Sequence, residues 1–302
     1  MLKKPEPLRP GDRIGIIAPS SPIREPFRSA GRRAIRELGF IPVEAANIES
    51  SQGLIAKPAQ AAFNDWIKFL HENEIKAVWA ARGGYGSNAM LDLLSAEPDL
   101  PLKAFIASSD ACYLLWRVLD YFRQVVFFGP MAYAGLAEGN FNADNLRDVL
   151  SGNHADLFIP GSIVRPGRFR GIITGGCLSI LISTMGTPYC PKLAGRALIL
   201  EDQNEKPHRL ERMIWQLAQS KILQKAGAVL LGEFPGCFRD HREKQSFQEY
   251  LLQCLPDKAI PVLSDLPLGH AKRALTLPLG IHIEVNTDLK AGFTLLEKGV
   301  AS

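Results

Sequence analysis

The first half of the chain alternates short apolar runs with segments of helical periodicity, and this alternation constrains the fold more than any other feature. Continuous apolar runs are typical of parallel strands that are buried on both faces. Strands that alternate with helices at this spacing form βαβ units. The predicted strands are 14–18, 41–43, 75–80, 104–107 and 125–128, and the predicted helices are 27–38, 59–70, 90–94, 114–119 and 142–150. We therefore predict an α/β domain over 1–148 with a parallel sheet of flavodoxin-like or Rossmann-like class.

The pattern changes after residue 148. Gly, Ser, Asn and Pro gather in 149–166, which we expect to be a linker. Beyond it the predicted strands are 168–174, 196–200 and 226–231, the predicted helices are 178–182, 210–217 and 246–255, and short strands are expected at 260–263, 275–277, 281–285 and 292–296. This predicts a second, mixed α/β domain with short strands over 167–302. A length of 302 residues also favours two domains.

Composition excludes several classes of function. Net charge is only +4, and no basic cluster with interleaved aromatic residues suggests nucleic-acid binding. No apolar run approaches the length of a membrane span, and no apolar segment follows the charged N-terminus as in a signal peptide. The five cysteines are scattered, without a CxxC pair or a Cys/His cluster, so we expect no metal and free thiols in a reducing cytoplasm.

Ser109 stands where the apolar run 104–107 meets a helical pattern. A nucleophile at a strand-to-helix joint needs small residues two positions before and after it, because the two backbones approach closely there. Ala107 and Ala111 meet this requirement for Ser109, whereas Ile106 and Asp110 would flank Ser108. Sterics therefore favour Ser109 as a candidate nucleophile. The alternative is that Ser109 is only a helix N-cap.

The glycine-rich segment RGGYG (82–86) follows the predicted strand 75–80. Its backbone N–H groups could bind an anion or form an oxyanion hole. It lacks the Lys-Ser/Thr of a phosphate-binding P-loop and the spacing of a dinucleotide fingerprint. Because strand-to-helix loops of a parallel sheet lie on one edge, we expect this segment close to the Ser109 turn. The alternative is a tight turn that simply requires glycine.

Two carboxylates and one histidine are further candidates for catalytic residues. Glu201 and Asp202 both follow the apolar run 196–200, and from the residues alone either could be a catalytic acid or a solvated surface group. His270 lies in the loop LPLGHA (266–271), where no periodicity predicts its burial. A lone histidine without a catalytic role is the alternative for that position.

In this order the pieces resemble one family, the LD-carboxypeptidases, which are serine peptidases that include murein tetrapeptide carboxypeptidase and the microcin C immunity peptidase. The blocks that carry the resemblance are LRPGDRIGIIAPS (8–20), ARGGYG (81–86), SD (109–110), GPM (129–131), GG (175–176), GTPY (186–189), LED (200–202), LGH (268–270) and LPLG (277–280). They extend along nearly the whole chain.

The resemblance implies a Ser–His–Glu triad of Ser109, His270 and Glu201, with the nucleophile in the N-terminal domain and the other two in the second. It implies hydrolysis of a bond between an L-centre and a D-residue, which releases terminal D-alanine from murein tetrapeptide in peptidoglycan recycling. Immunity-type members instead cleave an amide that links a peptidyl aspartate to a nucleotide. Cytoplasmic homodimers without metal or cofactor are expected.

General chemistry then assigns the remaining roles. The backbone N–H groups of Gly84 and Asp110 would bind the oxyanion. Arg82 is a candidate for the terminal carboxylate of a small peptide substrate, with a purely structural arginine as the alternative. Tyr85 and Ser108 are further candidate substrate contacts.

The sequence departs from the family pattern at four positions near these candidates. Ser108 replaces the usual Tyr, Ala107 the usual Gly, Phe128 the His of His-Gly-Pro and Cys177 the Asn of Gly-Gly-Asn. These departures bear on specificity. Three functions therefore remain open: a murein LD-carboxypeptidase, an immunity-type peptidase and a non-catalytic module that binds a peptide or nucleotide.

Overall fold

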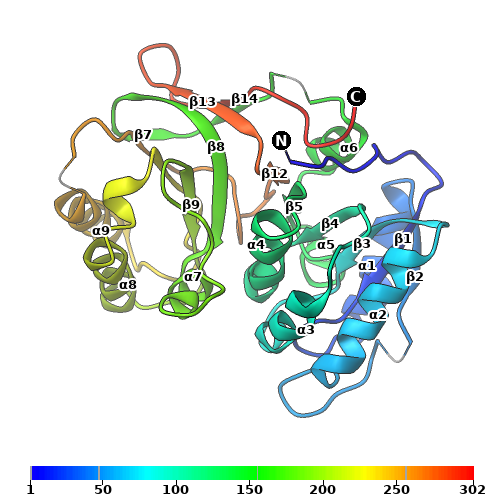
Figure 1. Ribbon diagram of the computed structural model, residues 1–302. Coiled ribbons are helices and arrows are strands. Elements are labelled where there is room, and N and C mark those ends of the chain that lie inside the picture. The colour runs from blue at the N-terminus through cyan, green and yellow to red at the C-terminus, as the bar shows by residue number, and fades with distance from the viewer. Residues whose placement is uncertain (1, 47, 155, 256) are drawn as a thin grey trace. The chain divides into compact units, whose positions relative to one another are not determined.

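The computed structural model describes residues 2–46, 48–154, 156–255 and 257–302. The chain divides into two compact units (Figure 1). The first consists of Met1–His154, Lys272–Gly280 and Lys298–Ser302, and the second of Ala155–Ala271 and Ile281–Glu297. The mixed α/β class with a parallel N-terminal sheet is confirmed.

The first unit is built on a sheet with strand order β12-β5-β4-β3-β1-β2. Its strands are β1 (Arg13–Ile17), β2 (Ile41–Glu44), β3 (Ile75–Ala80), β4 (Ala104–Ala107), β5 (Val126–Phe128) and β12 (Leu277–Leu279). The first five pair in parallel, and β12 pairs antiparallel with β5. The order 2-1-3-4-5 is the flavodoxin-like arrangement, in which ligands bind where the strand order reverses, between β1 and β3.

Helices follow the strands. They are α1 (Phe27–Glu37), α2 (Ala59–His71), α3 (Leu91–Ala96), α4 (Cys112–Asp120), α5 (Ala134–Ala137) and α6 (Ala143–Ser151), with the 3₁₀ turns η1 (Ser87–Met90) and η2 (Ser109–Ala111). All but α5 and the two short 3₁₀ turns correspond to predicted helices. Local chemistry sets the ends of α6: the side chain of Asn142 accepts a hydrogen bond from the Asn145 N–H, and Gly152 adopts the left-handed conformation after the last turn.

The second unit contains a sheet with strand order β6-β14-β13-β8-β9-β10-β11-β7. Its elements are β6 (Phe158–Pro160), β7 (Ser162–Arg165), β8 (Arg168–Cys177), α7 (Leu178–Thr184), β9 (Ala197–Glu201), α8 (Pro207–Gln219), η3 (Leu223–Lys225), β10 (Ala228–Leu231), α9 (His241–Cys254), β11 (Val262–Ser264), β13 (His282–Asn286) and β14 (Gly292–Leu295). Strands β8 to β11 are parallel, so their carboxyl ends share one edge.

Two segments differ from the sequence-based expectation. The stretch 149–166, expected to be a linker, contains β6 and β7. The strand expected near 275–277 in the second domain is β12, which pairs Leu277 with Phe128 and Leu279 with Val126 in the first sheet. An apolar strand at the edge of a parallel sheet requires a partner, and β12 supplies it.

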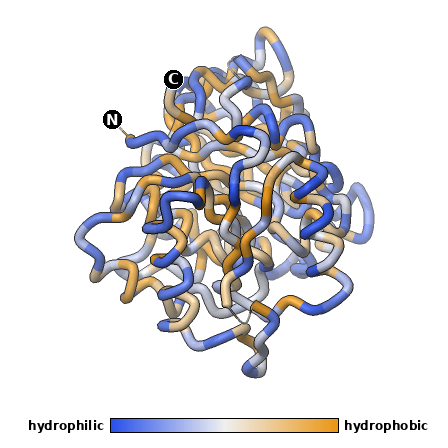
Figure 2. The backbone as a smooth tube through the Cα atoms, turned by 90° about the vertical axis from the view of Figure 1, so that its right-hand side faces the viewer, coloured by the Kyte–Doolittle hydropathy of each residue, from blue (hydrophilic) through white to orange (hydrophobic). Residues whose placement is uncertain are grey.

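The core follows the hydropathy of the strands. In Figure 2 apolar and hydrophilic stretches alternate along the backbone, as the sequence pattern requires. The largest fully buried side chains include Trp66, Trp79, Trp116, Tyr133, Phe105, Phe127, Phe128, Phe247 and Phe293. The indole N–H of Trp79 donates to the Pro130 carbonyl at 2.7 Å, which anchors the loop after β5 to β3.

Candidate active site

Ser109 lies two residues after the end of β4 and begins η2 with a left-handed backbone, φ 50°. A positive φ is uncommon for a residue other than glycine and is expected at the sharp strand-to-helix turn of a nucleophilic serine. Ser108 and Ala111 occupy the N-cap positions of η2 and α4, and neither makes a side-chain capping bond. The helix-cap interpretation of Ser109 therefore has no support in this geometry.

The small flanks of Ser109 are where the steric argument requires them. Ala107 and Ala111 are both fully buried. The Ala107 carbonyl accepts a hydrogen bond from the Gly129 N–H at 3.1 Å. A larger side chain at either position would have to displace this packing.

The glycine-rich loop lies against Ser109, as expected from the shared sheet edge. Strands β3 and β4 are paired neighbours. A Cβ atom on Gly83 would lie 2.8 Å from both Cβ and Oγ of Ser109. Gly84 has φ +110°, and a Cβ there would lie 2.3 Å from the Ser21 hydroxyl oxygen. Both glycines are therefore required by close approach.

The backbone of this loop is held from one side by Ser21, in the loop after β1. The Ser21 N–H donates to the Gly83 carbonyl at 3.3 Å, and the Tyr85 N–H donates to the Ser21 hydroxyl at 3.1 Å. Within the described ranges, neither Gly84 nor Asp110 uses its backbone N–H in an intramolecular hydrogen bond. These are the two groups that the sequence suggests for an oxyanion hole.

The three candidate substrate contacts differ in accessibility. Arg82 is exposed, and its guanidinium donates to the Pro22 carbonyl at 2.9 Å. Tyr85 is 56% exposed, whereas Ser108 is buried. Phe128 and Cys177, two of the departures from the family pattern, are also buried.

Glu201 and His270 form a hydrogen-bonded pair in the second unit. Glu201 ends β9 and is fully buried, and its Oε2 lies 2.7 Å from Nδ1 of His270. The same oxygen accepts the His270 backbone N–H at 3.3 Å. With Nδ1 donating to the carboxylate, Nε2 of the neutral ring is the basic nitrogen. This is the acid–histidine geometry of a catalytic triad.

Two glycines make room for this carboxylate. A Cβ on Gly269 would lie 2.2 Å from Cδ of Glu201, and one on Gly232 would lie 2.9 Å from its Cβ. The His270 loop is further held by the Glu233 N–H, which donates to the Leu268 carbonyl at 3.3 Å. Sequence reasoning missed Gly232, although its position directly after β10 is a signal that could have identified it.

Asp202 has a different environment from Glu201. Its carboxylate accepts hydrogen bonds from the N–H groups of Ser179 at 2.7 Å and of Gln203 at 2.9 Å. Ser179 is in the first turn of α7, so Asp202 stabilises the beginning of that helix. Burial raises the pKa of the Asp202 carboxyl above its ordinary value. The structure therefore pairs Glu201, rather than Asp202, with the histidine.

The predicted triad is divided between the units. Ser109 belongs to the first, and Glu201 and His270 belong to the second. The described residues contain no group of three or more His, Cys, Asp or Glu side chains that could hold a metal ion. None of the described helices is both long and apolar enough to cross a membrane.

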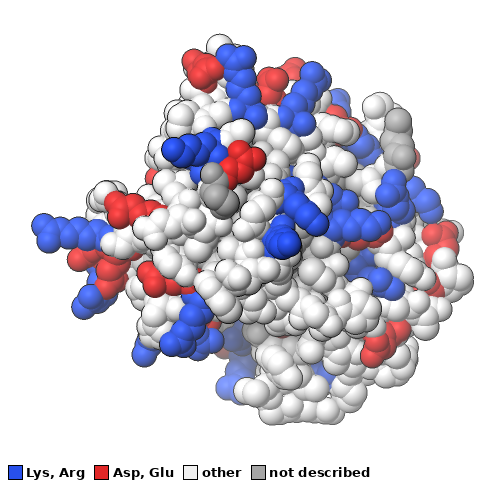
Figure 3. Space-filling model, turned by 60° about the vertical axis from the view of Figure 1, so that its left-hand side comes forward, with Lys and Arg blue, Asp and Glu red and all other residues white. Residues whose placement is uncertain are grey.

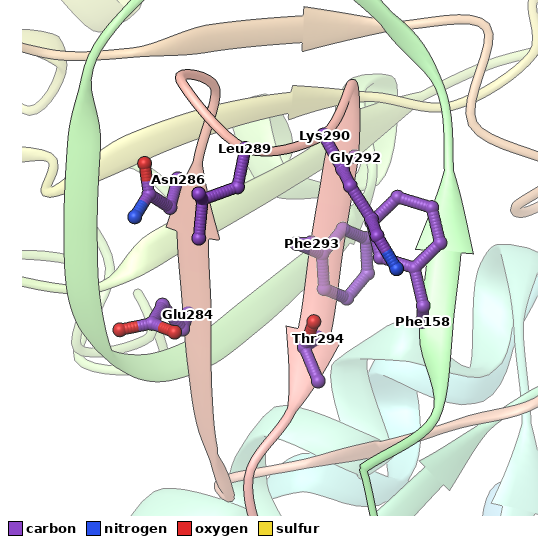
Figure 4. Close-up of a pocket in the computed structure, with 8 residues that line it drawn as sticks. All are labelled: Phe158, Glu284, Asn286, Leu289, Lys290, Gly292, Phe293 and Thr294. Atoms are coloured by element: carbon purple, nitrogen blue, oxygen red, sulfur yellow. The ribbon is translucent and has the colours of Figure 1, made fainter.

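A surface pocket of the second unit is lined by none of these candidate residues. It has a volume of 190 Å³ and is lined by Phe158, Glu284, Asn286, Leu289, Lys290, Gly292, Phe293 and Thr294, from the β6–β14–β13 part of the second sheet (Figure 4). Acidic and basic side chains are both spread over the face drawn in Figure 3.

Comparison with known proteins identifies the family. Residues 14–129 match the LD-carboxypeptidase N-terminal domain, and residues 170–285 match the LD-carboxypeptidase C-terminal domain. The chain therefore belongs to the LD-carboxypeptidase family and is a serine-type peptidase.

Its relatives carry two kinds of name. The chain is 27% identical to a protein of Bacillus subtilis named as a probable murein peptide carboxypeptidase, over 99% of this chain and 95% of that one. It is 28% identical to the murein tetrapeptide carboxypeptidase of Pseudomonas aeruginosa, over 89% and 91%. It is 25% identical to the microcin C7 self-immunity protein of Escherichia coli, over 94% and 93%.

Solved structures show the same fold. The muramoyltetrapeptide carboxypeptidase of Oxalobacter formigenes superposes with a TM-score of 0.79 at 25% identity, covering 93% of this chain and 97% of that one. The microcin C7 self-immunity protein superposes with a TM-score of 0.85 at 21% identity, covering 99% of both chains. The likeness to the second structure concerns the fold alone.

Proposed function

We propose that this protein hydrolyses an L,D-peptide bond and releases terminal D-alanine from murein tetrapeptide in peptidoglycan recycling, through a triad of Ser109, His270 and Glu201. The observation that carries the proposal is the 2.7 Å contact between Nδ1 of His270 and the buried Glu201 carboxylate. The left-handed turn at Ser109 and the names of the murein-directed relatives support it.

The mechanism follows from these groups. Nε2 of His270 removes the Ser109 proton as the hydroxyl oxygen attacks the scissile carbonyl, and Glu201 stabilises the imidazolium that forms. The tetrahedral intermediate expels D-alanine, whose amine takes the proton from His270. Water then attacks the acyl-enzyme as His270 takes one of its protons, and the second tetrahedral intermediate collapses to release the tripeptide while His270 returns the proton to the Ser109 oxygen.

The other proposed roles are electrostatic. The N–H groups of Gly84 and Asp110 stabilise the negative oxygen of the intermediate. Arg82 binds the terminal carboxylate of the peptide, since its single hydrogen bond to Pro22 leaves further N–H donors on the guanidinium. Tyr85 and Ser108 contact the substrate.

An immunity-type activity is the second candidate function. The microcin C7 self-immunity relative favours it, because a solved structure of that protein holds aspartyl sulfamoyl adenosine. In this reading the same triad cleaves an amide that joins a peptidyl or aminoacyl group to a nucleotide.

Two assays test these proposals. A fluorophosphonate probe should label the protein at Ser109, and Ser109→Ala should abolish the label. Incubation with murein tetrapeptide should release D-alanine, and His270→Ala should abolish release with an unchanged melting temperature. Release from an aminoacyl sulfamoyl adenosine in place of the tetrapeptide would select the second function, and absence of both activities in folded protein would refute the peptidase proposal.

The remaining expectations concern the assembly and its requirements. We propose a cytoplasmic homodimer that acts without metal or cofactor. Light scattering should give twice the 33.2 kDa mass of one chain. Activity that survives treatment with EDTA would support metal-free chemistry, and activity restored only by added metal would contradict it.

A further inference from the structure

The Asp110 side chain has its own hydrogen-bond partners, apart from the backbone N–H proposed for the oxyanion hole. Asp110 is 3% exposed, and its Oδ2 accepts two hydrogen bonds. The Ser20 hydroxyl donates at 2.6 Å and the Ser87 N–H donates at 2.9 Å. Ser20 and Ser87 are themselves buried, so this network is shielded from water.

A third contact makes the connection to Ser87 reciprocal. The Ser87 hydroxyl donates to the backbone carbonyl of Asp110 at 2.7 Å. Ser87 therefore gives one hydrogen bond to the side chain of Asp110 and one to its main chain. Two bonds between the same two residues fix both their separation and their orientation.

These contacts join three loops of one sheet edge. Ser20 belongs to the loop after β1, Ser87 begins η1 after the glycine-rich loop, and Asp110 lies in the turn after β4. Gly83 and Gly84 lie between β3 and Ser87. Glycine backbones have wide conformational freedom, so their position relative to Ser109 depends on how each end of the loop is held. β3 holds one end and Asp110 holds the other.

We propose that the Asp110 side chain is a positioning residue for the oxyanion site, an inference that rests on the proposed function. It sets the distance between the N–H groups of Gly84 and Asp110 by clamping Ser87 to the nucleophile turn. Preorganised donors stabilise a transition state only if they hold their positions while charge develops. Asp110 touches no reacting atom and acts through the loop.

The role is geometric rather than electrostatic. A negative charge near the oxyanion site opposes the charge that develops there, so the carboxylate gains nothing for catalysis from its charge. The carboxylate supplies one acceptor oxygen, Oδ2, to which both the Ser20 hydroxyl and the Ser87 N–H donate. An asparagine can present its amide oxygen at the same place and keep both hydrogen bonds.

The experiment measures the rate at which a fluorophosphonate labels Ser109, because this reaction needs the oxyanion site and no knowledge of the substrate. Asp110→Ala should lower the maximal labelling rate by about 10²-fold and leave half-saturation unchanged, as expected for loss of an oxyanion donor. Asp110→Asn should remain within about threefold of the wild type, because it keeps the acceptor.

Ser20→Ala is the second variant. It tests the positioning role if Asp110→Ala shows no cooperative unfolding transition and is therefore not folded. It removes one donor to Oδ2 and should slow labelling about fivefold, the worth of one hydrogen bond. It should have no further effect in the Asp110→Ala background. Ser95→Ala is the control, since the Ser95 hydroxyl donates to Leu91 within α3 of the same unit at 2.5 Å, and its labelling rate should not change.

The outcomes separate the two proposals. Wild-type protein that is never labelled at Ser109 and releases no product overturns the proposed function and the inference together. Normal labelling of Asp110→Ala or of Ser20→Ala overturns the inference alone. Loss of labelling in Asp110→Asn equal to that in Asp110→Ala also overturns it, because charge rather than geometry would then be required.

Discussion

Glu201 is the last residue of β9 and Asp202 follows it, and their carboxylates have different partners. Successive side chains along an extended backbone point to opposite sides, so neighbours of the same charge can meet separate sets of groups. Glu201 meets Nδ1 of His270 at 2.7 Å, and Asp202 instead accepts the Ser179 N–H of α7. One residue orients the histidine and its neighbour holds a helix.

This difference gives a first prediction. Glu201→Ala should lower kcat/KM by about 10³-fold or more, because the histidine loses its orienting partner. Asp202→Ala should keep activity within about tenfold and lower the free energy of unfolding by about 1 kcal/mol, the cost of a lost helix cap. Peptide hydrolysis and chemical denaturation measure the two effects. A larger loss of turnover in Asp202→Ala than in Glu201→Ala would show that the acid is misassigned.

The sequence alone distinguishes the candidate nucleophile from its neighbour, but it does not distinguish the two candidate acids. Ser109 could be preferred to Ser108 because the steric demand of a tight turn is local and acts on residues close in sequence. Glu201 could not be preferred to Asp202, since the choice depends on which side of β9 faces the loop after β11. That fact belongs to the tertiary structure.

At the scale of elements, the loop after β3 is shaped by the turn after β4. Gly83 has no positive φ, so an added methyl group would strain nothing in its backbone. It would meet the Cβ and Oγ atoms of Ser109, at 2.8 Å, and would lie 3.6 Å from the backbone nitrogen of Asp110. The glycine is therefore needed because two loops approach each other and not because the chain turns there.

A second prediction follows from this approach. Gly83→Ala should destabilise the protein by about 1–3 kcal/mol, as overpacking does, and abolish labelling of Ser109. In a Ser109→Gly background, where the clashing atoms are absent, the same substitution should be nearly neutral for stability. Thermal unfolding of the four proteins in this cycle provides the measurement, and an equal cost in both backgrounds would contradict the proposed contact.

Another interaction between elements predicts pH dependence. Glu44 of β2 accepts hydrogen bonds from Arg28 of α1 at 2.6 Å and from the Tyr133 hydroxyl at 2.6 Å. Burial alone would raise the pKa of the Glu44 carboxyl, but these hydrogen bonds outweigh it and hold the pKa below the ordinary 4.5.

The sign of the effect follows by linkage. A depressed carboxyl pKa contributes stability that is present above the unfolded pKa and is lost as pH falls through the folded one. Glu44→Gln should therefore cost about 1–3 kcal/mol at pH 7 and lose less stability than the wild type on acidification below about pH 4.5. Glu49→Gln is the control, because Glu49 also lies near Arg28, at 3.4 Å, but is 58% exposed. Parallel acid curves for wild type and Glu44→Gln would refute the prediction.

The elements themselves could be predicted where their pattern is strong. The central strands β1, β3 and β4 are mostly apolar, with the exposed Lys76 as the one charged residue within β3, and the structure places all three within about a residue of the expected limits. β6 and β7 could not be found, because they are short, lie among Gly and Pro residues, and gain their partners only from β14 and β11. Pairing between distant segments leaves little trace in the local sequence.

At the scale of the whole molecule, the chain leaves and rejoins each unit. Segments 272–280 and 298–302 return to the first unit after the chain has built most of the second. The sequence predicts two domains, but it does not predict this return, because β12 resembles the other short strands of the tail. Its antiparallel pairing with β5 is visible only in the assembled sheet.

A fourth prediction concerns a truncated chain. Residues 1–154 alone should show no cooperative thermal transition, since the apolar edge of β5 is left without β12 and invites aggregation. Attaching 272–280 through a flexible linker should restore a transition. Circular dichroism and light scattering check both forms, and a fragment 1–154 that melts as sharply as the full chain would disprove the need for β12.

The chain passes from one unit to the other at residues 154/155, 271/272, 280/281 and 297/298. Neither unit is thus a continuous stretch of sequence. A chimaera that takes one whole unit from a relative therefore needs a join at each of these four crossings, and a single cut cannot separate the candidate nucleophile from the candidate acid and base without also dividing a unit.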